Sequence, residues 1–230
     1  MSSIQLVVFD IAGTTVRDKG NVADSFISAF RDFGFKIPLP EVKKVMGFRK
    51  IDAITILLDK FAPEKKEDEM LVDRIHTHFI DTMIAFYRND EGLAPLPHAE
   101  RVFSNLQKKG IKVALNTGFT RSITDALLHR LRWDNRNKDI DQVICSDEVP
   151  NGRPSPDMIN TLVSGLGIAS PAQVLKVGDT EVDVLEGRNA GCGIVVSITT
   201  GAYTREQLQE YHPDHIIDDL AQLLPIIEKA

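Results

Sequence analysis

The sequence predicts an α/β protein whose core is a doubly wound parallel sheet, with an all-helical cap inserted after the first strand. Short apolar runs rich in β-branched residues recur along the chain and alternate with helical segments, as a parallel sheet requires. Between residues 21 and 89 the apolar residues follow helical spacing instead, and no strand is evident. Polar residues stand directly after several apolar runs. We therefore expect a functional site beyond the carboxyl ends of the strands, where open α/β sheets bind ligands.

The first of five predicted strands is the most distinct. The run IQLVVF at residues 4–9 is apolar throughout and ends at Asp10, before the glycine-containing turn IAGTT. Such a continuous run is typical of a strand that is buried on both faces. The other four strands are predicted at residues 111–115, 141–144, 174–177 and 193–198. Helices are predicted between them at residues 99–109, 121–131, 156–166 and 183–190.

The predicted cap spans residues 17–91, and the core comprises residues 1–16 and 92–230. Within the cap, the charged segment PEKKEDE is most simply a solvated connection between helices. We expect the cap to hinge near Val16–Gly20 and Glu91–Pro95, so that it can close over a substrate and exclude water.

Composition and charge narrow the classes of protein. The chain of 230 residues is 43% apolar and 26% charged, which is ordinary for a globular protein, and its net charge of −6 argues against nucleic-acid binding. No apolar stretch reaches the roughly eighteen residues of a membrane span, and the first residues lack a signal peptide's basic region, so we expect a cytoplasmic protein without membrane contact. Cys145 and Cys192 have no metal-ligand spacing and are expected to be buried small side chains.

Polar side chains follow three of the predicted strands. Asp10 closes the first, Thr117 follows another in NTG, and Asp179 follows a third in VGDTEVD, with Asp183 four residues later. Arg153 stands in GRPSPD, just before a proline-started helix. An aspartate after a strand is often only a turn or helix-cap residue. In this combination, however, the five residues indicate a site for phosphoryl transfer.

Phosphoryl transfer needs these residue types. A carboxylate such as Asp10 can attack phosphorus and form an aspartyl phosphate, which divides the displacement into two easier steps. Mg²⁺ binds one or two carboxylates together with carbonyl and water oxygens, and Asp10 with Asp179 suits that need. The Thr117 hydroxyl can hold a non-bridging oxygen, and the cation of Arg153 can neutralise charge on the attacked group.

The succession FDxAGTT, NTG, GRP and VGDTxxDxxEGRNAG resembles the four motifs of the haloacid dehalogenase superfamily, whose members are mostly phosphohydrolases with a Rossmann-like core. The resemblance spans nearly the whole chain, and it extends to the helical insertion, which is similar to the superfamily's first class of cap. It implies that Asp10 is the nucleophile, and that the Ala12 carbonyl and Asp179 also bind Mg²⁺. Asp183 would support the metal site.

The same resemblance implies the substrate contacts. Thr117 would bind phosphate and Arg153 would be the cation of the third motif, with Thr14 and Gly118 as further substrate-binding residues.

Two departures from the superfamily pattern are informative. Where this chain has Ala12, ordinary phosphatases of the superfamily carry a second aspartate, which protonates the leaving alkoxide. Where this chain has Arg153, the superfamily more often has a lysine. Both features resemble the phosphonoacetaldehyde hydrolases, phosphonatases that cleave a carbon–phosphorus bond. The cap segment MGFRKID is similar to a motif of those enzymes and places Lys50 at their Schiff-base lysine, with Arg49 beside it as a substrate-binding residue.

A Schiff base fits the chemistry, because carbon is a poor leaving group and needs an electron sink. An iminium on Lys50 would let the carbon depart as an enamine, without an acid at Ala12. For this the lysine pKa must fall from about 10.4 to roughly 7 to 8, and desolvation and Arg49 could both lower it. The plainer alternative is a solvated surface lysine.

Two substitutions leave the substrate open. The phosphonatases have a histidine where this chain has Ala53, and a tyrosine where it has Phe119. A related 2-oxo-alkylphosphonate, or proton transfer by water or another side chain, would fit. For His76 and His78, packing or surface positions are expected rather than replacement of the missing histidine.

Three hypotheses result: a phosphonatase-like hydrolase using Asp10 and Lys50, a phosphatase for a small phosphate monoester, and a non-catalytic protein that binds phosphate and Mg²⁺. A small phosphonate or phosphate is the expected partner in each case. The resemblance also allows a homodimer formed through the caps.

Overall fold

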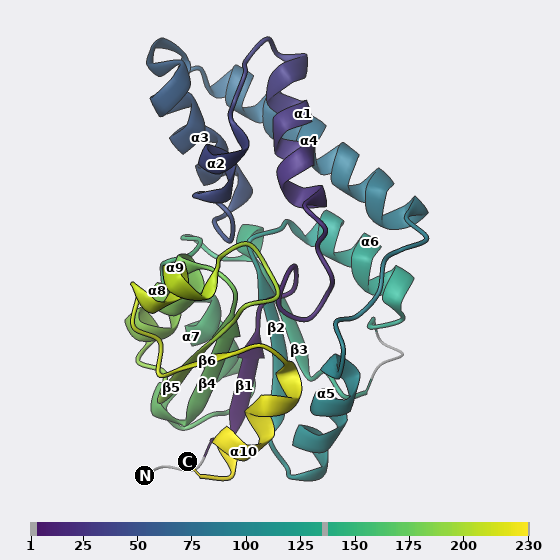
Figure 1. Cartoon of the computed structure of the whole chain (residues 1–230), viewed down its shortest axis with the longest axis vertical. Coiled ribbons are helices and arrows are strands. Elements are labelled where there is room, and N and C mark those ends of the chain that lie inside the picture. Colours follow the sequence, from purple (N-terminus) through teal and green to yellow (C-terminus); the bar gives the residue numbers. More distant parts are fainter. Residues whose placement is uncertain (1–3, 135–137, 230) are drawn as a thin grey trace.

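The computed structural model describes residues 4–134 and 138–229. Its core is a parallel sheet with the strand order β3-β2-β1-β4-β5-β6 (Figure 1). The six strands are β1 (Leu6–Phe9), β2 (Lys112–Thr117), β3 (Gln142–Cys145), β4 (Val174–Gly178), β5 (Ile194–Ile198) and β6 (His215–Ile217). The predicted α/β class and doubly wound parallel sheet are confirmed.

Helices cover both faces of the sheet, which explains why the central strand β1 is apolar at every position. Successive side chains of a strand point to opposite faces. Leu6 and Val8 of β1 therefore pack in one cluster with residues of α7 (Asp157–Gly165) and α8 (Glu181–Ala190). Val7 and Phe9 pack in the other, with residues of α5 (Ala99–Lys108), α6 (Arg121–Leu131) and α10 (Leu223–Ile227).

Some short elements were not predicted. Strand β6 has only three residues, which is too few for an alternation pattern to stand out, and α9 (Arg205–Gln209) is equally short. Helix α8 begins two residues before the predicted start, because Thr180 and Asp183 form a capping box there. Four 3₁₀ turns complete the described part of the chain: η1 (Pro63–Lys65), η2 (Ser146–Glu148), η3 (Pro171–Gln173) and η4 (Leu220–Gln222).

The cap consists of α1 (Asn21–Asp32), α2 (Leu39–Lys43), α3 (Lys50–Phe61) and α4 (Glu69–Asn89), at the top of Figure 1. Its core contains the stacked rings of Phe26 and Phe79, whose centroids lie 4.4 Å apart. The PEKKEDE segment is exposed between α3 and α4, as predicted. Helix α4 also packs on α6, so the cap rests on the core along part of its length.

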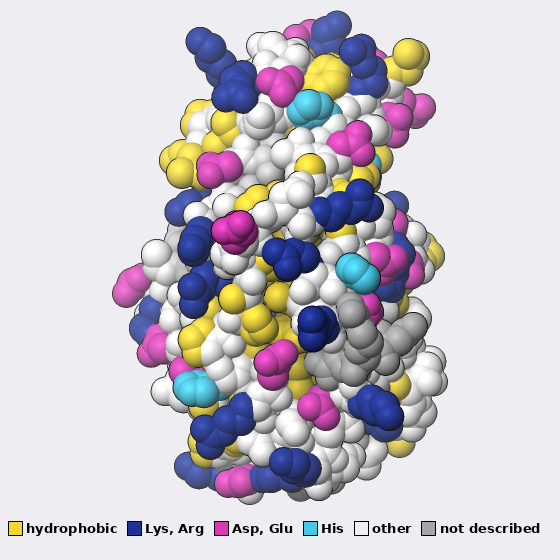
Figure 2. Space-filling view, turned by 90° about the vertical axis from the view of Figure 1, so that its right-hand side faces the viewer, with side chains coloured by type: hydrophobic (Ala, Val, Ile, Leu, Met, Phe, Trp, Pro, Cys, Tyr) yellow, Lys and Arg dark blue, Asp and Glu magenta, His cyan; other side chains and the backbone are white. Residues whose placement is uncertain are grey.

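The two linkers between cap and core run side by side. The Leu96 amide donates to the Thr15 carbonyl at 2.8 Å, and the Arg17 amide donates to the Ala94 carbonyl at 3.1 Å. The cap therefore leaves and re-enters the core through one paired connection. The Arg17–Ala94 bond lies within the segments where hinges were expected, and the Thr15–Leu96 bond lies one residue outside them. On the face shown in Figure 2, a narrower waist separates cap from core, and cationic and anionic side chains are interspersed over both. Within the described ranges, no helix is long and apolar enough to cross a membrane.

Candidate active site

The ends of three parallel strands form the floor of the site. Phe9 of β1 pairs in register with Leu115 of β2 and Val177 of β4. Asp10, Thr117 and Asp179 therefore reach the same edge of the sheet, and all three line one cavity. Each is at most 5% exposed, which shows that the strand ends deliver these polar groups into a largely closed space.

Arg153 holds the expected nucleophile. Its Nη1 donates to Asp10 Oδ1 at 2.6 Å, and its Nη2 donates to the Asn116 carbonyl and side-chain oxygens at 2.8 and 2.6 Å. The guanidinium is 1% exposed, so these contacts replace water almost entirely. Arginine suits this position because its planar fork can bind several oxygens at once.

A buried charge network lies behind Arg153, and the sequence reasoning missed most of it. Lys176 Nζ lies 2.9 Å from Asp183 Oδ1 and 3.3 Å from Glu186 Oε2, while Arg153 Nε lies 3.0 Å from the same Glu186 oxygen. Asn116 donates to both Glu186 oxygens at 2.8 and 2.9 Å. Two cations thus face Asp183, Glu186 and the nucleophile. A lysine inside a strand and a glutamate inside a helix carry no signal beyond their burial, which only the fold reveals.

Asp183 has no free oxygen toward the cavity. Its Oδ1 faces Lys176 and Arg153, and its Oδ2 accepts from the Thr180 hydroxyl at 2.6 Å. Burial alone would raise its pKa, but Arg153 and Lys176 lower the pKa below the ordinary aspartate value. Asp183 does not line the cavity. Its placement suits a support for the site, not a direct metal ligand.

Backbone and hydroxyl groups surround Asp179. Its Oδ1 accepts from the Thr14 hydroxyl at 3.0 Å and its Oδ2 accepts from the Ala202 amide at 2.7 Å. A Cβ at Gly13 would lie 2.7 Å from Asp179 Oδ2, and a Cβ at Gly201 would overlap the same oxygen. Thr14 was expected to bind substrate, but its hydroxyl is occupied by Asp179 and it does not line the cavity. The loop after β5, for which no role was predicted, helps to fix this carboxylate.

The electrostatics of Asp10 and Asp179 suit a cation. Burial raises the pKa of both carboxyls, and for Asp179 the nearby Asp10 raises it further. Ala12 lines the cavity beside them. The described residues contain no group of three or more His, Cys, Asp or Glu side chains arranged for a metal. The expected ligand set is therefore two carboxylates and a carbonyl, which fits Mg²⁺, an ion that retains several waters.

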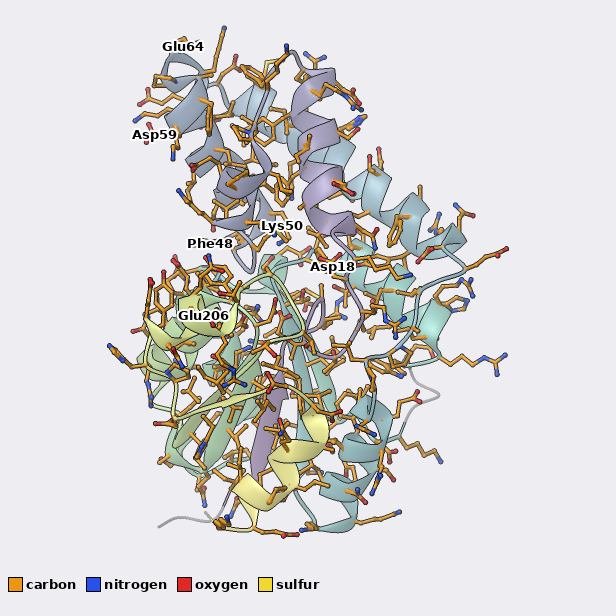
Figure 3. The ribbon with its side chains drawn as sticks, in the orientation of Figure 1. Asp18, Phe48, Lys50, Asp59, Glu64 and Glu206 are labelled. Carbon is orange, nitrogen blue, oxygen red and sulfur yellow. The ribbon has the colours of Figure 1, made fainter. Side chains whose placement is uncertain are left out.

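Lys50 lies in the same cavity, at the first position of α3 (Figure 3). It is 3% exposed, so the alternative of a solvated surface lysine is wrong. Its Nζ donates to the Phe48 carbonyl at 3.1 Å and lies 5.1 Å from the centre of the Phe119 ring and 5.7 Å from that of Phe26. Burial, and secondarily Arg153, lowers the Lys50 pKa to about 8, against the opposing effect of Asp10.

Arg49 does not contribute as expected. Its Nη1 donates to the Pro150 carbonyl at 3.0 Å, and the residue does not line the cavity. The cationic neighbour that lowers the Lys50 pKa is Arg153. Arg49 instead ties the cap to the core.

The cap loop closes directly on the strand ends. A Cβ on Gly118 would overlap the Phe48 carbonyl and lie 2.7 Å from the Gly47 carbonyl. Gly47 itself has a φ of +83°, and a Cβ there would lie 2.6 Å from Val182 Cγ2. Two glycines, one on each side, therefore allow the cap and core backbones to meet. The enclosed cavity is only about 30 Å³, space for one or two waters.

The remaining titratable candidates lie elsewhere. His78 Nε2 lies 3.0 Å from Asp32 Oδ2, and neither His76 nor His78 lines the cavity. Cys145 and Cys192 are buried free thiols, as expected.

Residues 4–191 match the family model of haloacid dehalogenase-like hydrolases. The chain belongs to this family and is therefore a hydrolase by class, which confirms the resemblance seen in its motifs.

Within the family the chain is similar to phosphonoacetaldehyde hydrolases. It is 30% identical over 256 residues to that of Bordetella pertussis, covering 97% of this chain and 91% of the relative. It is 30% identical over 223 residues to that of Bacillus cereus, covering 91% and 83%. A bifunctional phosphonoacetaldehyde hydrolase/aminoethylphosphonate transaminase of Clostridioides difficile is 34% identical over 207 residues, covering 85% of this chain but only 31% of the longer relative.

Solved structures share the fold. A phosphonoacetaldehyde hydrolase-like protein from Oleispira antarctica superposes with a TM-score of 0.83 at 22% identity, covering 98% of this chain and 92% of the other. A predicted phosphoglycolate phosphatase from Haemophilus somnus gives 0.77 at 22% identity, covering 98% and 99%. At this identity the two structures show only that the architecture is shared, and they do not indicate whether this chain acts on phosphonates or on phosphate esters.

Proposed function

We propose that the protein is a Mg²⁺-dependent phosphonatase that cleaves a 2-oxo-alkylphosphonate such as phosphonoacetaldehyde, through a Schiff base on Lys50 and an aspartyl phosphate on Asp10. One observation carries the proposal: a buried lysine with a lowered pKa shares a closed cavity with Asp10. Similarity to phosphonoacetaldehyde hydrolases supports the substrate class.

Lys50 acts first. Its amine is neutral in an appreciable fraction near neutral pH, because its pKa is about 8. The neutral amine attacks the carbonyl carbon, and loss of water leaves an iminium. The iminium then accepts the electron pair of the carbon–phosphorus bond, so that the carbon leaves as an enamine.

Asp10 attacks phosphorus as that bond breaks. Arg153 holds one carboxylate oxygen at 2.6 Å and so would fix the direction of attack, and the Thr117 hydroxyl, in the same cavity, would contact a phosphoryl oxygen. Asp10, the Ala12 carbonyl and Asp179 would hold Mg²⁺, which supplies charge neutralisation for the phosphoryl group. Water then hydrolyses the aspartyl phosphate and releases phosphate.

The cap must open to admit substrate. A cavity of about 30 Å³ cannot hold a phosphonate of seven or so heavy atoms, since a single water needs roughly 10–15 Å³. The paired linkers around Thr15 and Leu96 are the place for this motion. When the cap closes, it brings Lys50 to the reacting carbonyl and excludes water.

The second candidate is a phosphatase acting on a small phosphate monoester. The predicted phosphoglycolate phosphatase among the related folds favours it. Ala12 speaks against it, because an alkoxide leaving group needs a proton donor and alanine has none. A non-catalytic binding protein is the third candidate. The close contact between Arg153 and Asp10 argues for a working site instead.

The test is phosphate release with Mg²⁺ from phosphonoacetaldehyde and from a panel of phosphate monoesters. Asp10→Asn and Lys50→Ala should each abolish cleavage of the phosphonate, and borohydride with the phosphonate should trap an adduct on Lys50. Lys36→Ala, an exposed cap lysine, is the matched control. Ester hydrolysis that needs Asp10 and is indifferent to Lys50 would instead identify a phosphatase. The oligomeric state measured on the same samples tests for a homodimer through the caps.

A further inference from the structure

Asp18 is a carboxylate of the cavity that the proposed mechanism has not yet used. It lies in the linker just before α1, and Figure 3 shows it beside Lys50 where the cap meets the core. Its Oδ1 accepts from the amides of Gly20 at 2.9 Å and Asn21 at 2.8 Å. These two bonds fix the carboxylate in place at the wall of the cavity that holds Lys50 and Asp10.

Asp18 also lines a second, larger space. A pocket of about 350 Å³ lies on the other side of the same wall, next to α1 and α2. Among the residues that the structure describes, Asp18, Met46 and Ala202 line both spaces, and of these three Asp18 is the one whose side chain can carry a proton. The carboxylate thus connects a closed cavity with a pocket large enough to hold many waters.

The charges around Asp18 allow it to exchange a proton with Lys50. Burial raises the Asp18 pKa, although its backbone hydrogen bonds act in the opposite direction. The charge of Asp18 in turn acts on Lys50 and favours its protonated form. The other titratable groups facing Asp18 are Asp10 and Asp179 in the cavity, Tyr87 of α4, and Lys19, Asp24 and Lys43 around the larger pocket.

Imine chemistry in a closed cavity needs such a group. The lysine ammonium must lose a proton before it attacks, and the carbonyl oxygen must gain two protons before it leaves as water. Asp10 is committed to phosphorus, and Asp179 is committed to its Thr14 and Ala202 contacts and to the expected metal. Among the described residues that line the cavity, Asp18 is the carboxylate that remains.

We propose that Asp18 is the acid–base residue for the Schiff-base chemistry of Lys50. The inference rests on the proposed function. Asp18 accepts a proton from the Lys50 ammonium, and the amine forms a bond to the carbonyl carbon while one of its remaining protons passes to the carbonyl oxygen. Asp18 then gives its proton to the hydroxyl of this carbinolamine, which leaves as water and gives the iminium. After the carbon–phosphorus bond breaks, Asp18 takes a proton from water in the larger pocket and delivers it to the enamine carbon, and the resulting iminium is hydrolysed to free the Lys50 amine.

Asp18→Asn tests the proposal, because an asparagine oxygen can still accept from the Gly20 and Asn21 amides and preserve the helix start. The measurements are the rate of borohydride trapping on Lys50 and single-turnover cleavage of phosphonoacetaldehyde. Acetyl phosphate, which needs Asp10 but no imine, is the reference substrate. Asp81→Asn, at an exposed aspartate of α4, is the matched control.

We expect Asp18→Asn to slow trapping and carbon–phosphorus cleavage by roughly 10²- to 10⁴-fold, the range of general acid–base catalysis. The rate of acetyl phosphate hydrolysis should fall by a factor at least ten times smaller than that of carbon–phosphorus cleavage. Asp18→Glu should retain part of the trapping and cleavage rates that Asp18→Asn loses. Equal trapping rates in wild type and Asp18→Asn would overturn the role of Asp18 while leaving the Schiff base intact. Absence of any adduct in wild type would overturn the proposed function, and this inference with it.

Discussion

Arg153 Nη1 and Asp10 Oδ1 lie 2.6 Å apart, and both residues are buried at the carboxyl end of β1. The contact orients the expected nucleophile and counteracts the rise in its pKa that burial causes. It also ties the nucleophile to the network of Lys176, Asp183 and Glu186 behind it. We therefore expect catalysis and stability to depend on the same guanidinium.

Replacing Arg153 should affect both properties. Arg153→Met leaves Glu186 and Asp10 short of a partner, and loss of one member of a buried ion pair costs roughly 3–5 kcal/mol of unfolding free energy. Arg153→Lys keeps the charge and should lose less stability, but phosphoryl transfer should fall about a hundredfold because the oriented donor is lost. Denaturant melts and phosphate release measure the two effects, with Arg101→Met, on an exposed side chain, as control. Full activity in Arg153→Met would contradict the orienting role.

The pH dependence of carbon–phosphorus cleavage should follow Lys50. Burial lowers its pKa to about 8, and only the neutral amine attacks a carbonyl. We expect kcat/KM for phosphonoacetaldehyde to rise with pH and level off above about pH 8. The rate of acetyl phosphate hydrolysis should not show this rise with pH, because that reaction needs no amine. The same rise with pH in both reactions would show that a group other than Lys50 causes it.

Lys50 should also destabilise the fold at neutral pH. Its pKa is lowered from 10.5 in an exposed chain to about 8, so the unfolded state binds more protons between these values. The penalty is complete below about pH 8 and disappears as the pH rises toward 10.5. Lys50→Met should therefore raise the unfolding free energy at pH 7 by at most on the order of 3 kcal/mol, since one pKa unit is roughly 1.4 kcal/mol. Denaturant melts against pH measure the gain, and an unchanged or lower stability would show that the amine is adequately solvated.

Mg²⁺ should stabilise the protein. Asp10 and Asp179 repel each other in a buried site, so a cation that binds the folded state raises the unfolding free energy by roughly 3 kcal/mol at a hundred times its Kd. Melting temperatures with Mg²⁺ and with chelator measure this. Gly201→Ala should reduce the shift, because its Cβ would overlap Asp179. Gly110→Ala is the control: its φ of +74° will lower stability, but its Cβ meets nothing within 4 Å, so the shift caused by Mg²⁺ should be retained. No shift in wild type would argue against the metal site.

A wedge between cap and core should separate the two half-reactions. Gly118→Ala places a methyl group against the Gly47 and Phe48 carbonyls of the cap loop and should hold the cap open. Lys50 would then be withdrawn from the strand ends. We expect the rate of phosphonoacetaldehyde cleavage to fall at least tenfold further than that of acetyl phosphate hydrolysis, because only the first reaction needs the closed cap to bring Lys50 to the substrate. Equal losses would mean that Gly118 acts on the phosphoryl group alone.

Local sequence patterns predicted five of the six described strands and the polar residues that follow them. The apolar runs around β1 and β4 are local patterns, and a strand buried on both faces needs nothing else to be recognised. The motifs likewise identified Asp10, Asp179 and Arg153 before any contact was known. Short elements such as β6 escaped because their stability comes from the neighbouring strand and not from their own residues.

Which charges are buried, and what they face, depends on tertiary packing. Lys176 and Glu186 are ordinary charged residues in the sequence, and Lys50 was singled out only by the motif around it. The packing of distant segments removes all three from water. Packing also directs Arg49 to the Pro150 carbonyl, so the cation that lowers the Lys50 pKa is Arg153 and not Arg49 as expected. A pKa depends on desolvation and on charges brought near by the fold, so no local pattern could have determined it.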